Sequence, residues 1–162
     1  MKTTYPMCYS KSIQTRLVLP PDTNHHDSIF GGKVLAYIDE IAAISAMKHS
    51  QGEVVTASFD SVDFVSPAYA GDMIELEAMV TGTGRTSMEV YVRVVSRNVK
   101  TGAKKLTTES FVTMVAIDAE GNPKEVPEGE PETEFERHLF ETGPIRQEHR
   151  KQKRALSKKR RG

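Results

Sequence analysis

Hydrophobic and polar residues alternate along five segments of the chain. The alternation is clearest in residues 53–65, 73–82, 86–99 and 104–118, and a weaker version covers residues 9–19. A period of two places alternate side chains on opposite faces of a strand, so each segment is expected to have one buried face and one wetter face. This pattern is typical of an antiparallel sheet.

One long segment follows a helical period instead. Apolar positions recur about every 3.6 residues between Gly31 and Gly52. They are Val34, Ile38 and Ile41, with Ser45 continuing the row. The pattern predicts a helix of about 18 residues, roughly 27 Å long at 1.5 Å per residue. A helix of that length can cross a sheet, so the predicted fold class is α+β, with one long central helix packed on an antiparallel sheet.

The alternation stops near Asp118, and a charged extension follows. We therefore expect a domain of residues 1–118 and an extension of residues 119–162. A helical pattern begins near residue 132, and three apolar side chains are expected to dock it: Phe135, Leu139 and Phe140. From Arg146 onward the chain is charged and shows no apolar face, which predicts a helical or disordered tail.

Charge is unevenly distributed, although 22 basic and 22 acidic residues give a formal net charge of zero. Residues 118–141 hold nine acidic side chains against two basic ones, and residues 145–162 hold nine basic side chains against one acidic one. A basic run can attract nucleic acid or an anionic membrane, but no aromatic residue follows Phe140 to stack on bases. We expect neither partner, and we expect the basic block to meet an acidic segment of its own or a neighbouring chain. A chain that ends near Glu148 should then keep its activity.

The composition and the absence of certain motifs exclude several classes of protein. A single cysteine, Cys8, excludes an internal disulfide framework and a cysteine-rich zinc cluster, and no GxSxG serine elbow occurs. The N-terminal residues lack the apolar core of a signal peptide. No apolar run reaches the roughly 20 residues of a membrane span. A cytoplasmic location is expected.

Asp39 lies in an otherwise apolar stretch of the predicted helix, between Ile38 and Ala42. A carboxylate there either faces solvent or is kept for a purpose, because burying an unpaired charge is costly. Glu40 comes next in the chain and cannot face the same surface as Asp39. The residues by themselves leave both interpretations of Asp39 open.

The loop before the helix combines polar residues with two glycines. Its residues 23–27 read Thr-Asn-His-His-Asp, and Gly31 and Gly32 open the helix. Glycines at a helix start let backbone N–H groups approach a ligand, and the positive helix end favours developing negative charge. That arrangement suits an oxyanion site for acyl transfer, although a capped helix entry explains the same residues. His25 and His26 have no partner at metal-binding spacing, so no metal is expected.

A second glycine-rich turn joins two of the predicted strands. Residues 82–87 read Gly-Thr-Gly-Arg-Thr-Ser and so offer Arg85, Thr86 and Ser87. They do not form a dinucleotide fingerprint, because the third glycine is absent and no helix follows. A hairpin turn and a phosphate contact are both compatible with this segment.

Taken together, the order strand, loop, long helix and four strands resembles the hotdog fold. The segments PPDTNHHDSIFGGKVLAYIDE and FVSPAYAGD, followed by GRTS, are similar to motifs of hotdog acyl-CoA thioesterases, in particular the cytosolic acyl-CoA hydrolases. The resemblance covers roughly residues 10–118. It implies an enzyme that hydrolyses acyl-CoA thioesters to free fatty acid and coenzyme A, with coenzyme A as part of the substrate and no separate cofactor.

The resemblance also implies roles for individual residues. Asn24 matches the family's catalytic asparagine and Asp39 its helix-borne catalytic acid, and in such enzymes the two come from opposite subunits. The N–H groups at Gly31 or Gly32 would polarise the thioester carbonyl, and Thr56 would lie near the reacting group. Three residues match the contacts to the phosphate end of coenzyme A: Arg85, Thr86 and Ser87. Relatives often have glycine where this chain has Asp27, a departure that affects the backbone shape and the local charge of this loop.

Assembly is expected to be a homo-oligomer. A sheet that wraps one helix leaves an edge strand open, and pairing with a second chain removes that edge. Family resemblance implies a dimer as the minimum unit and a hexamer built as a trimer of dimers.

Two other functions are compatible with the sequence. A hotdog hydratase or dehydratase would use an Asp/His pair, and His25 and His26 lie close to Asn24. A non-enzymatic module that binds and senses acyl-CoA is the second alternative. Within the hydrolase hypothesis, Asp39 is expected to act as general base, and direct attack to form a mixed anhydride stays open.

Overall fold

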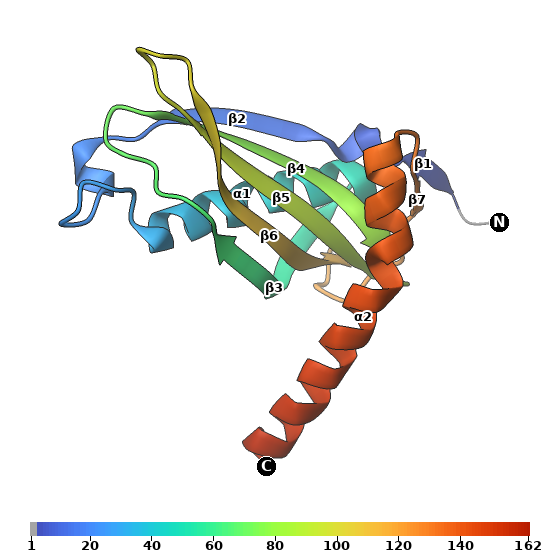
Figure 1. Ribbon diagram of the computed structural model, residues 1–162. Helices are drawn as coiled ribbons and strands as arrows, with labels where there is room; N and C mark the ends of the chain where they lie inside the picture. Colours follow the sequence, from blue (N-terminus) through green and yellow to red (C-terminus); the bar gives the residue numbers. More distant parts are fainter. Residues whose placement is uncertain (1–2) are drawn as a thin grey trace.

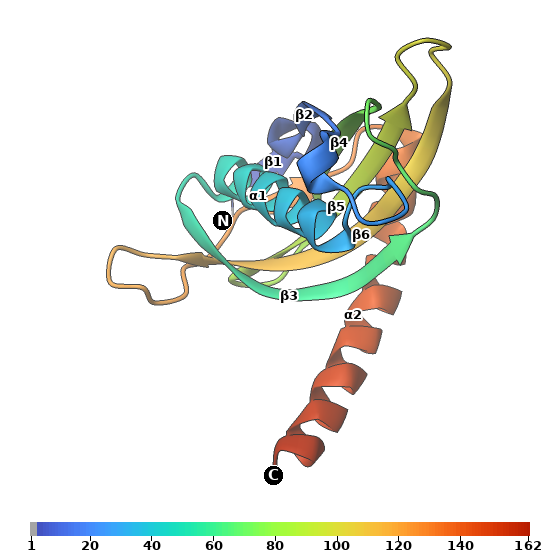
Figure 2. The same ribbon diagram turned by 90° about the vertical axis from the view of Figure 1, so that its left-hand side faces the viewer.

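A long helix lies against the concave face of one curved sheet in the computed structural model, which describes residues 3–162 (Figure 1). The helix is α1 (Gly31–Ser50). The five antiparallel strands are β2 (Ser12–Leu17), β3 (Glu53–Phe64), β4 (Met73–Thr83), β5 (Ser87–Arg97) and β6 (Lys104–Ile117). Their order is β2-β4-β5-β6-β3, and Figure 2 shows β3 curving beneath α1. The predicted α+β hotdog architecture is confirmed.

The core lies between α1 and the sheet. The apolar row of the helix is buried there, and alternate residues of three strands face it. On β5 these are Met88, Val90, Val92 and Val94, all with no exposed surface. The apolar face of the strands, set by a period of two, and that of the helix, set by a period of 3.6, therefore pack into one layer. Burial of this layer drives the folding of the unit.

The N-terminal strand is shorter than the sequence pattern predicts. Residues 9–19 were expected as one strand, but Met7–Ser10 form a 3-10 helix and only Ser12–Leu17 pair with β4. The side chain of Ser10 explains the break, because its hydroxyl donates to the carbonyl of Met7 and accepts from the N–H of Val80. Residues 1 and 2 of the expected domain lie outside the described residues.

The segment after Asp118 returns to the body of the protein. Val126 enters the apolar core, and β7 (Glu128–Glu130) pairs in parallel with β1 (Thr4–Pro6). The buried His49, at the end of α1, contacts the carbonyl oxygen of Pro127 through Nε2 at 2.8 Å. Burial lowers the pKa of His49 even though this carbonyl favours the charged form.

The C-terminal residues form one helix, α2 (Glu134–Arg161), so the helical alternative for the tail is confirmed. Thr133 caps it, with its hydroxyl accepting from the N–H of Glu136. The first half of α2 lies on the outer face of the sheet, and the second half projects away from the body (Figures 1 and 2). Leu139 is buried as predicted, whereas Phe140 is 45% exposed. The first half of α2 therefore covers part of the outer sheet face, which the alternation of the strands predicted to be exposed to water.

No helix within residues 3–162 is long and apolar enough to cross a membrane.

Candidate active site

Asp39 is held by a residue of the neighbouring strand. The Oγ1 of Thr56, on β3, donates to Oδ1 of Asp39 at 2.6 Å. Asp39 is half-buried, and the same hydroxyl lies 3.5 Å from the sulfur of Met114. A carboxylate whose second oxygen is left for other partners, at the boundary of an apolar layer, is suited to accept a proton from water.

Glu40 points in a different direction from Asp39, as the sequence predicts. It is exposed and accepts from Arg16 at 2.8 Å and from Gln14 at 3.2 Å, both on β2. The two neighbouring carboxylates therefore have separate tasks. Glu40 fastens the helix to the edge of the sheet, and Asp39 faces β3.

Asn24 lies on the loop that leads into α1. Its Oδ1 accepts from the backbone N–H of His26 at 2.8 Å and from the hydroxyl of Ser28 at 3.2 Å. The side-chain NH₂ group is thus the end of Asn24 that can donate to a ligand. Asp27 sits in the left-handed region at φ 60°, a conformation that glycine adopts more readily.

The first turn of α1 presents backbone N–H groups to the outside. The cap residue Phe30 supplies no side-chain hydrogen bond, and the first N–H groups of a helix have no partner within it. A Cβ on Gly32 would lie 2.7 Å from the ring of Phe30, whereas one on Gly31 would make ordinary contact with Phe64 at 3.5 Å. A Cβ at position 32 would therefore require the exposed ring of Phe30 to move.

A cavity of about 340 Å³ opens beside this helix start. Its lining is mainly apolar and includes Val34 at the start of α1, Phe64 at the end of β3, and Val65 and Pro67 after β3. Gly31 lies on its wall, so the helix N–H groups and an apolar space are adjacent.

The residues predicted to meet the phosphate end of coenzyme A lie at the β4–β5 turn. Thr86 and Ser87 line a second cavity, of about 520 Å³, between this hairpin and α2. Arg85 is largely exposed and lies 3.9 Å from Glu125. The strand register links this turn to the Asp39 region, because Thr56 pairs with Met114 and Met114 pairs with Met88.

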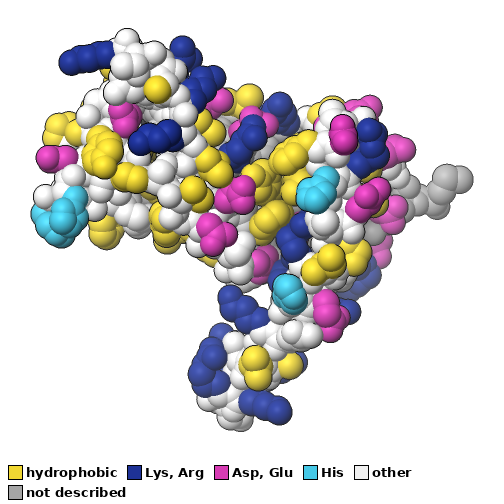
Figure 3. All heavy atoms as spheres, in the orientation of Figure 1, with side chains coloured by type: hydrophobic (Ala, Val, Ile, Leu, Met, Phe, Trp, Pro, Cys, Tyr) yellow, Lys and Arg dark blue, Asp and Glu magenta, His cyan; other side chains and the backbone are white. Residues whose placement is uncertain are grey.

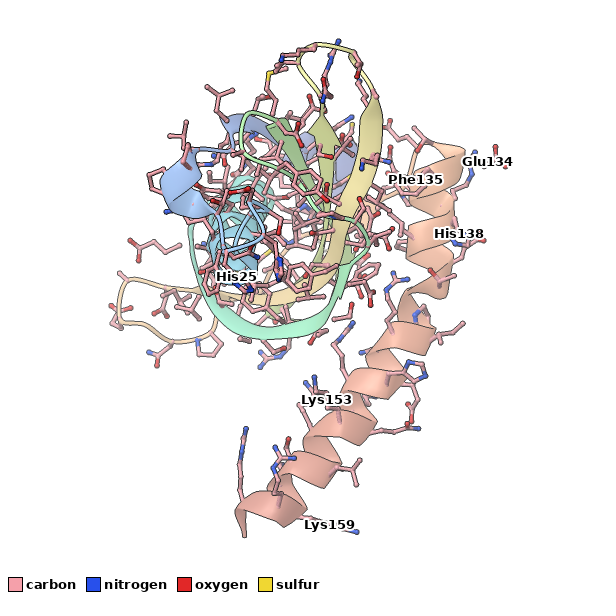
Figure 4. The ribbon with its side chains drawn as sticks, turned by 60° about the vertical axis from the view of Figure 1, so that its left-hand side comes forward. His25, Glu134, Phe135, His138, Lys153 and Lys159 are labelled. Atoms are coloured by element: carbon pink, nitrogen blue, oxygen red, sulfur yellow. The ribbon has the colours of Figure 1, made fainter. Side chains whose placement is uncertain are left out.

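Within the single chain, the predicted catalytic residues form two separate groups. Asp39 and Thr56 are in contact, and Asn24 is bonded only within its own loop. Among the described residues no hydrogen bond joins Asn24 to Asp39. His25 and His26 lie next to each other on this exposed loop, with ring centroids 3.9 Å apart and ring planes tilted by 44°. Figure 4 labels His25 on the loop. In residues 3–162 no group of three or more His, Cys, Asp or Glu side chains is placed to hold a metal.

Sequence reasoning missed a charged cluster beneath α2. Glu89, on β5, is 4% exposed and is bound by Arg146 through both carboxylate oxygens, each at 2.9 Å. Arg150 adds a contact of 2.7 Å, and the hydroxyl of Thr81 donates at 2.8 Å. Burial raises the pKa of Glu89, but the hydrogen bonds from Arg146 and Thr81 and the nearby positive charges outweigh it and lower the pKa. The prediction of a tail without a buried face was wrong, because its guanidinium groups dock on this carboxylate.

Comparison with known proteins places this site in context. The family model described as the thioesterase superfamily matches residues 26–103. An uncharacterised acyl-CoA thioester hydrolase of Bacillus subtilis is 47% identical over 148 residues, covering 91% of this chain and 86% of that protein.

Solved structures resemble the whole chain. A hexameric acyl-CoA thioesterase is 66% identical with a TM-score of 0.93, covering 95% of this chain and 99% of that one. An acyl-CoA hydrolase of Staphylococcus aureus, solved with butyryl coenzyme A, coenzyme A and coenzyme A disulfide, is 47% identical with a TM-score of 0.92. That match covers 96% of this chain and 95% of the other. The Staphylococcus aureus enzyme has also been solved with one aspartate, one asparagine or one threonine changed to alanine.

Proposed function

The chain belongs to the thioesterase superfamily, and we propose that its acyl-CoA hydrolysis uses Asn24, Asp39 and Thr56 at a site completed by a second subunit. It is an acyl-CoA thioester hydrolase, which splits an acyl-CoA into a fatty acid and coenzyme A. The observation that carries the residue assignment is the 2.6 Å hydrogen bond that fixes Asp39 at the edge of the core.

Thioester hydrolysis needs a nucleophilic water, a base for its proton and donors for the carbonyl oxygen. Asp39 is the base: Thr56 holds one carboxylate oxygen, and the other accepts the proton of the water. The N–H groups at Gly31 or Gly32 stabilise the oxyanion as charge develops, at the positive end of α1. Asn24 donates its NH₂ group to orient the water or the carbonyl.

The Staphylococcus aureus variants support the choice of these three residues. In that enzyme the altered asparagine precedes the altered aspartate by 15 residues, and the threonine follows it by 17. The same intervals separate Asn24, Asp39 and Thr56 in this chain.

A shared site follows from the separation of Asn24 and Asp39. Asp39 lies about 12 Å along α1 from the first residue of the helix, at 1.5 Å per residue. A second copy that pairs with the exposed edge strand β3 would bring its own Asn24 loop toward this carboxylate. Hexameric relatives support an assembly of three such dimers.

Release of coenzyme A from butyryl-CoA tests the assignment. Asp39→Ala and Asn24→Ala are each expected to lower kcat by about 100-fold or more, as for the loss of a general base or an oxyanion donor. Glu40→Ala is the matched control, since Glu40 is the adjacent carboxylate and binds only β2. Wild-type rates in both Asp39→Ala and Asn24→Ala would refute the site.

A further inference from the structure

The last residues of α2, 154–161, form a projecting end that lies beyond the edge of the sheet. The helix crosses the outer sheet face from Leu139, which packs beside β4 and β5, to Arg146, which lies over the ring of Phe111 on β6. Lys153 reaches the edge strand β3, where it lines a cavity of about 220 Å³. The projecting end extends about 12 Å further at 1.5 Å per residue and stands clear of the body (Figures 1 and 2).

The projecting end is basic and has no counter-charge in its own chain. It holds five exposed basic side chains and no acidic one: Arg154, Lys158, Lys159, Arg160 and Arg161. Within residues 3–162 none of the five forms an ion pair. Arg154, Lys158 and Arg161 follow at intervals of four and three residues, so they share one face of the helix. Like charges at these intervals repel each other.

A helix with this charge pattern needs a negatively charged surface against its basic face. The helix dipole favours basic residues only in the last turn, and most helical stability in proteins comes from the packing of one face. Leu156 is the one large apolar side chain after Ile145, which is too few for an amphipathic membrane helix. No aromatic residue follows Phe140 to stack on bases. An acidic protein surface is the partner that fits best.

An acidic surface of this kind lies at the other end of α2. It consists of exposed carboxylates before the helix and in its first two turns: Glu120, Glu125, Glu128, Glu130, Glu132, Glu134 and Glu141. Among the described residues, Glu125 alone of these has an ion pair, at 3.9 Å from Arg85. The basic residues of the same stretch are Lys124 and Arg137. Figure 3 shows acidic side chains around the start of α2 and basic ones at its far end.

One chain cannot bring its two charged surfaces together, because α2 is a continuous helix of 28 residues, about 42 Å long. A second copy of the chain offers the same acidic surface to the projecting end. The contact then joins two different surfaces, and such contacts form closed rings when the rotation between copies closes. It leaves β3 free for the dimer, so the two contacts together can build a hexamer from three dimers.

We propose that the projecting end of α2 docks on the acidic surface of a second copy, with Arg154, Lys158 and Arg161 facing the carboxylates around β7, and that this contact joins dimers. The proposal rests on the proposed function, to which the dimer paired through β3 belongs. A chain that ends near Glu148 should then form an active dimer, in keeping with the activity expected of such a chain.

Charge reversal, followed by size exclusion with light scattering at about 0.15 M salt, tests the contact. The first variant carries three changes on the projecting end: Arg154→Glu, Lys158→Glu and Arg161→Glu. The second carries three changes on the acidic surface: Glu128→Lys, Glu130→Lys and Glu132→Lys. Each should have about one third of the wild-type mass, because like charges now face each other. A chain with both sets of changes has the two signs exchanged and should return to the wild-type mass.

The control makes the same change of charge on an exposed hairpin and should keep the wild-type mass: Lys100→Glu, Lys104→Glu and Lys105→Glu. A first variant with the wild-type mass would overturn the proposal, and so would a doubly reversed chain that stays small. Binding of a labelled DNA duplex by wild type but not by the first variant, with equal masses, would show that the projecting end takes nucleic acid instead. Hydrolysis is a separate readout: a wild-type hexamer that leaves butyryl-CoA intact would refute the hydrolase function, whereas the masses alone decide the contact.

Discussion

The hydroxyl of Thr56 is the residue-scale feature that distinguishes Asp39 from Glu40, the other carboxylate of α1. Thr56 lies on the exposed edge strand, yet its hydroxyl is fixed by Asp39 and lies against Met114. A short hydrogen bond of this kind holds a carboxylate in one rotamer, which is what a positioned base requires.

Replacement of Thr56 tests this positioning role. Thr56→Val keeps the shape of the side chain but removes the donor, so kcat for butyryl-CoA should fall about tenfold as the carboxylate loses its fixed orientation. Thr56→Ser keeps the hydroxyl and should retain most of the activity. Equal rates for the valine and serine variants would contradict the role.

The two glycines at the start of α1 provide a second residue-scale prediction. Gly32→Ala places a Cβ against the exposed ring of Phe30 and should lower kcat, because the ring must move at the turn that carries the N–H groups. Gly31→Ala makes only ordinary contact and should cost less. Steady-state kinetics that rank the two variants in the opposite order would argue against N–H groups at this turn.

At the scale of elements, α2 is joined to the sheet by a buried ionic cluster as well as by apolar packing. Arg146 also lies over the ring of Phe111, 4.4 Å from its centre, and Leu139 packs beside it in a small apolar group. Removing one partner of a buried pair leaves the other charge poorly compensated.

Arg146→Ala should lower the free energy of unfolding by about 2–3 kcal/mol, because Glu89 stays buried with only Arg150 beside it. Lys151→Ala, an exposed position on the same helix, should change it by less than about 0.5 kcal/mol. Urea denaturation at one fixed protein concentration measures both. A similar midpoint for the two variants would show that the cluster does not hold α2.

The lowered pKa of Glu89 gives this cluster a pH dependence. The unfolded chain binds the proton of Glu89 more readily than the folded chain, so stability from the cluster is present above the ordinary glutamate pKa and is lost as pH falls through the lower folded value. The melting temperature of wild type should therefore exceed that of Glu89→Gln at pH 7, and the gap should shrink below about pH 4. A gap that is constant from pH 7 to pH 3 would contradict this.

The sequence predicts the elements well wherever one apolar face decides the structure. The period of α1 and the alternation of β5 identify the side chains that meet in the core. The docking of α2 could not be predicted, because hydrophobic patterning counts Arg146 and Arg150 as solvent-facing, and their partner Glu89 is about 60 residues away in the chain. The contact between Asp39 and Thr56 depends on how β3 curves around α1, which no local pattern records.

At the scale of the whole molecule, the exposed edge strand β3 connects assembly with catalysis. It is 12 residues long and ends the sheet opposite β2, so its free backbone groups are available to a second copy. The two charged blocks do not neutralise each other within the described chain, where the ion pairs of the basic block go to Glu89. We expect the active species to have about six times the 18.0 kDa mass of one chain, and light scattering after size exclusion measures this. A fully active monomer would contradict the shared site.

Subunit complementation tests the central claim most directly. Asn24→Ala and Asp39→Ala chains should each be inactive alone, but a mixed dimer contains one site with the wild-type Asn24 of one chain and the wild-type Asp39 of the other. Co-refolding equal amounts should therefore restore about a quarter of the wild-type rate of butyryl-CoA hydrolysis, since half of the dimers are mixed and each carries one intact site. If both residues act within one chain, every site in the mixture lacks one of them, and no activity will return.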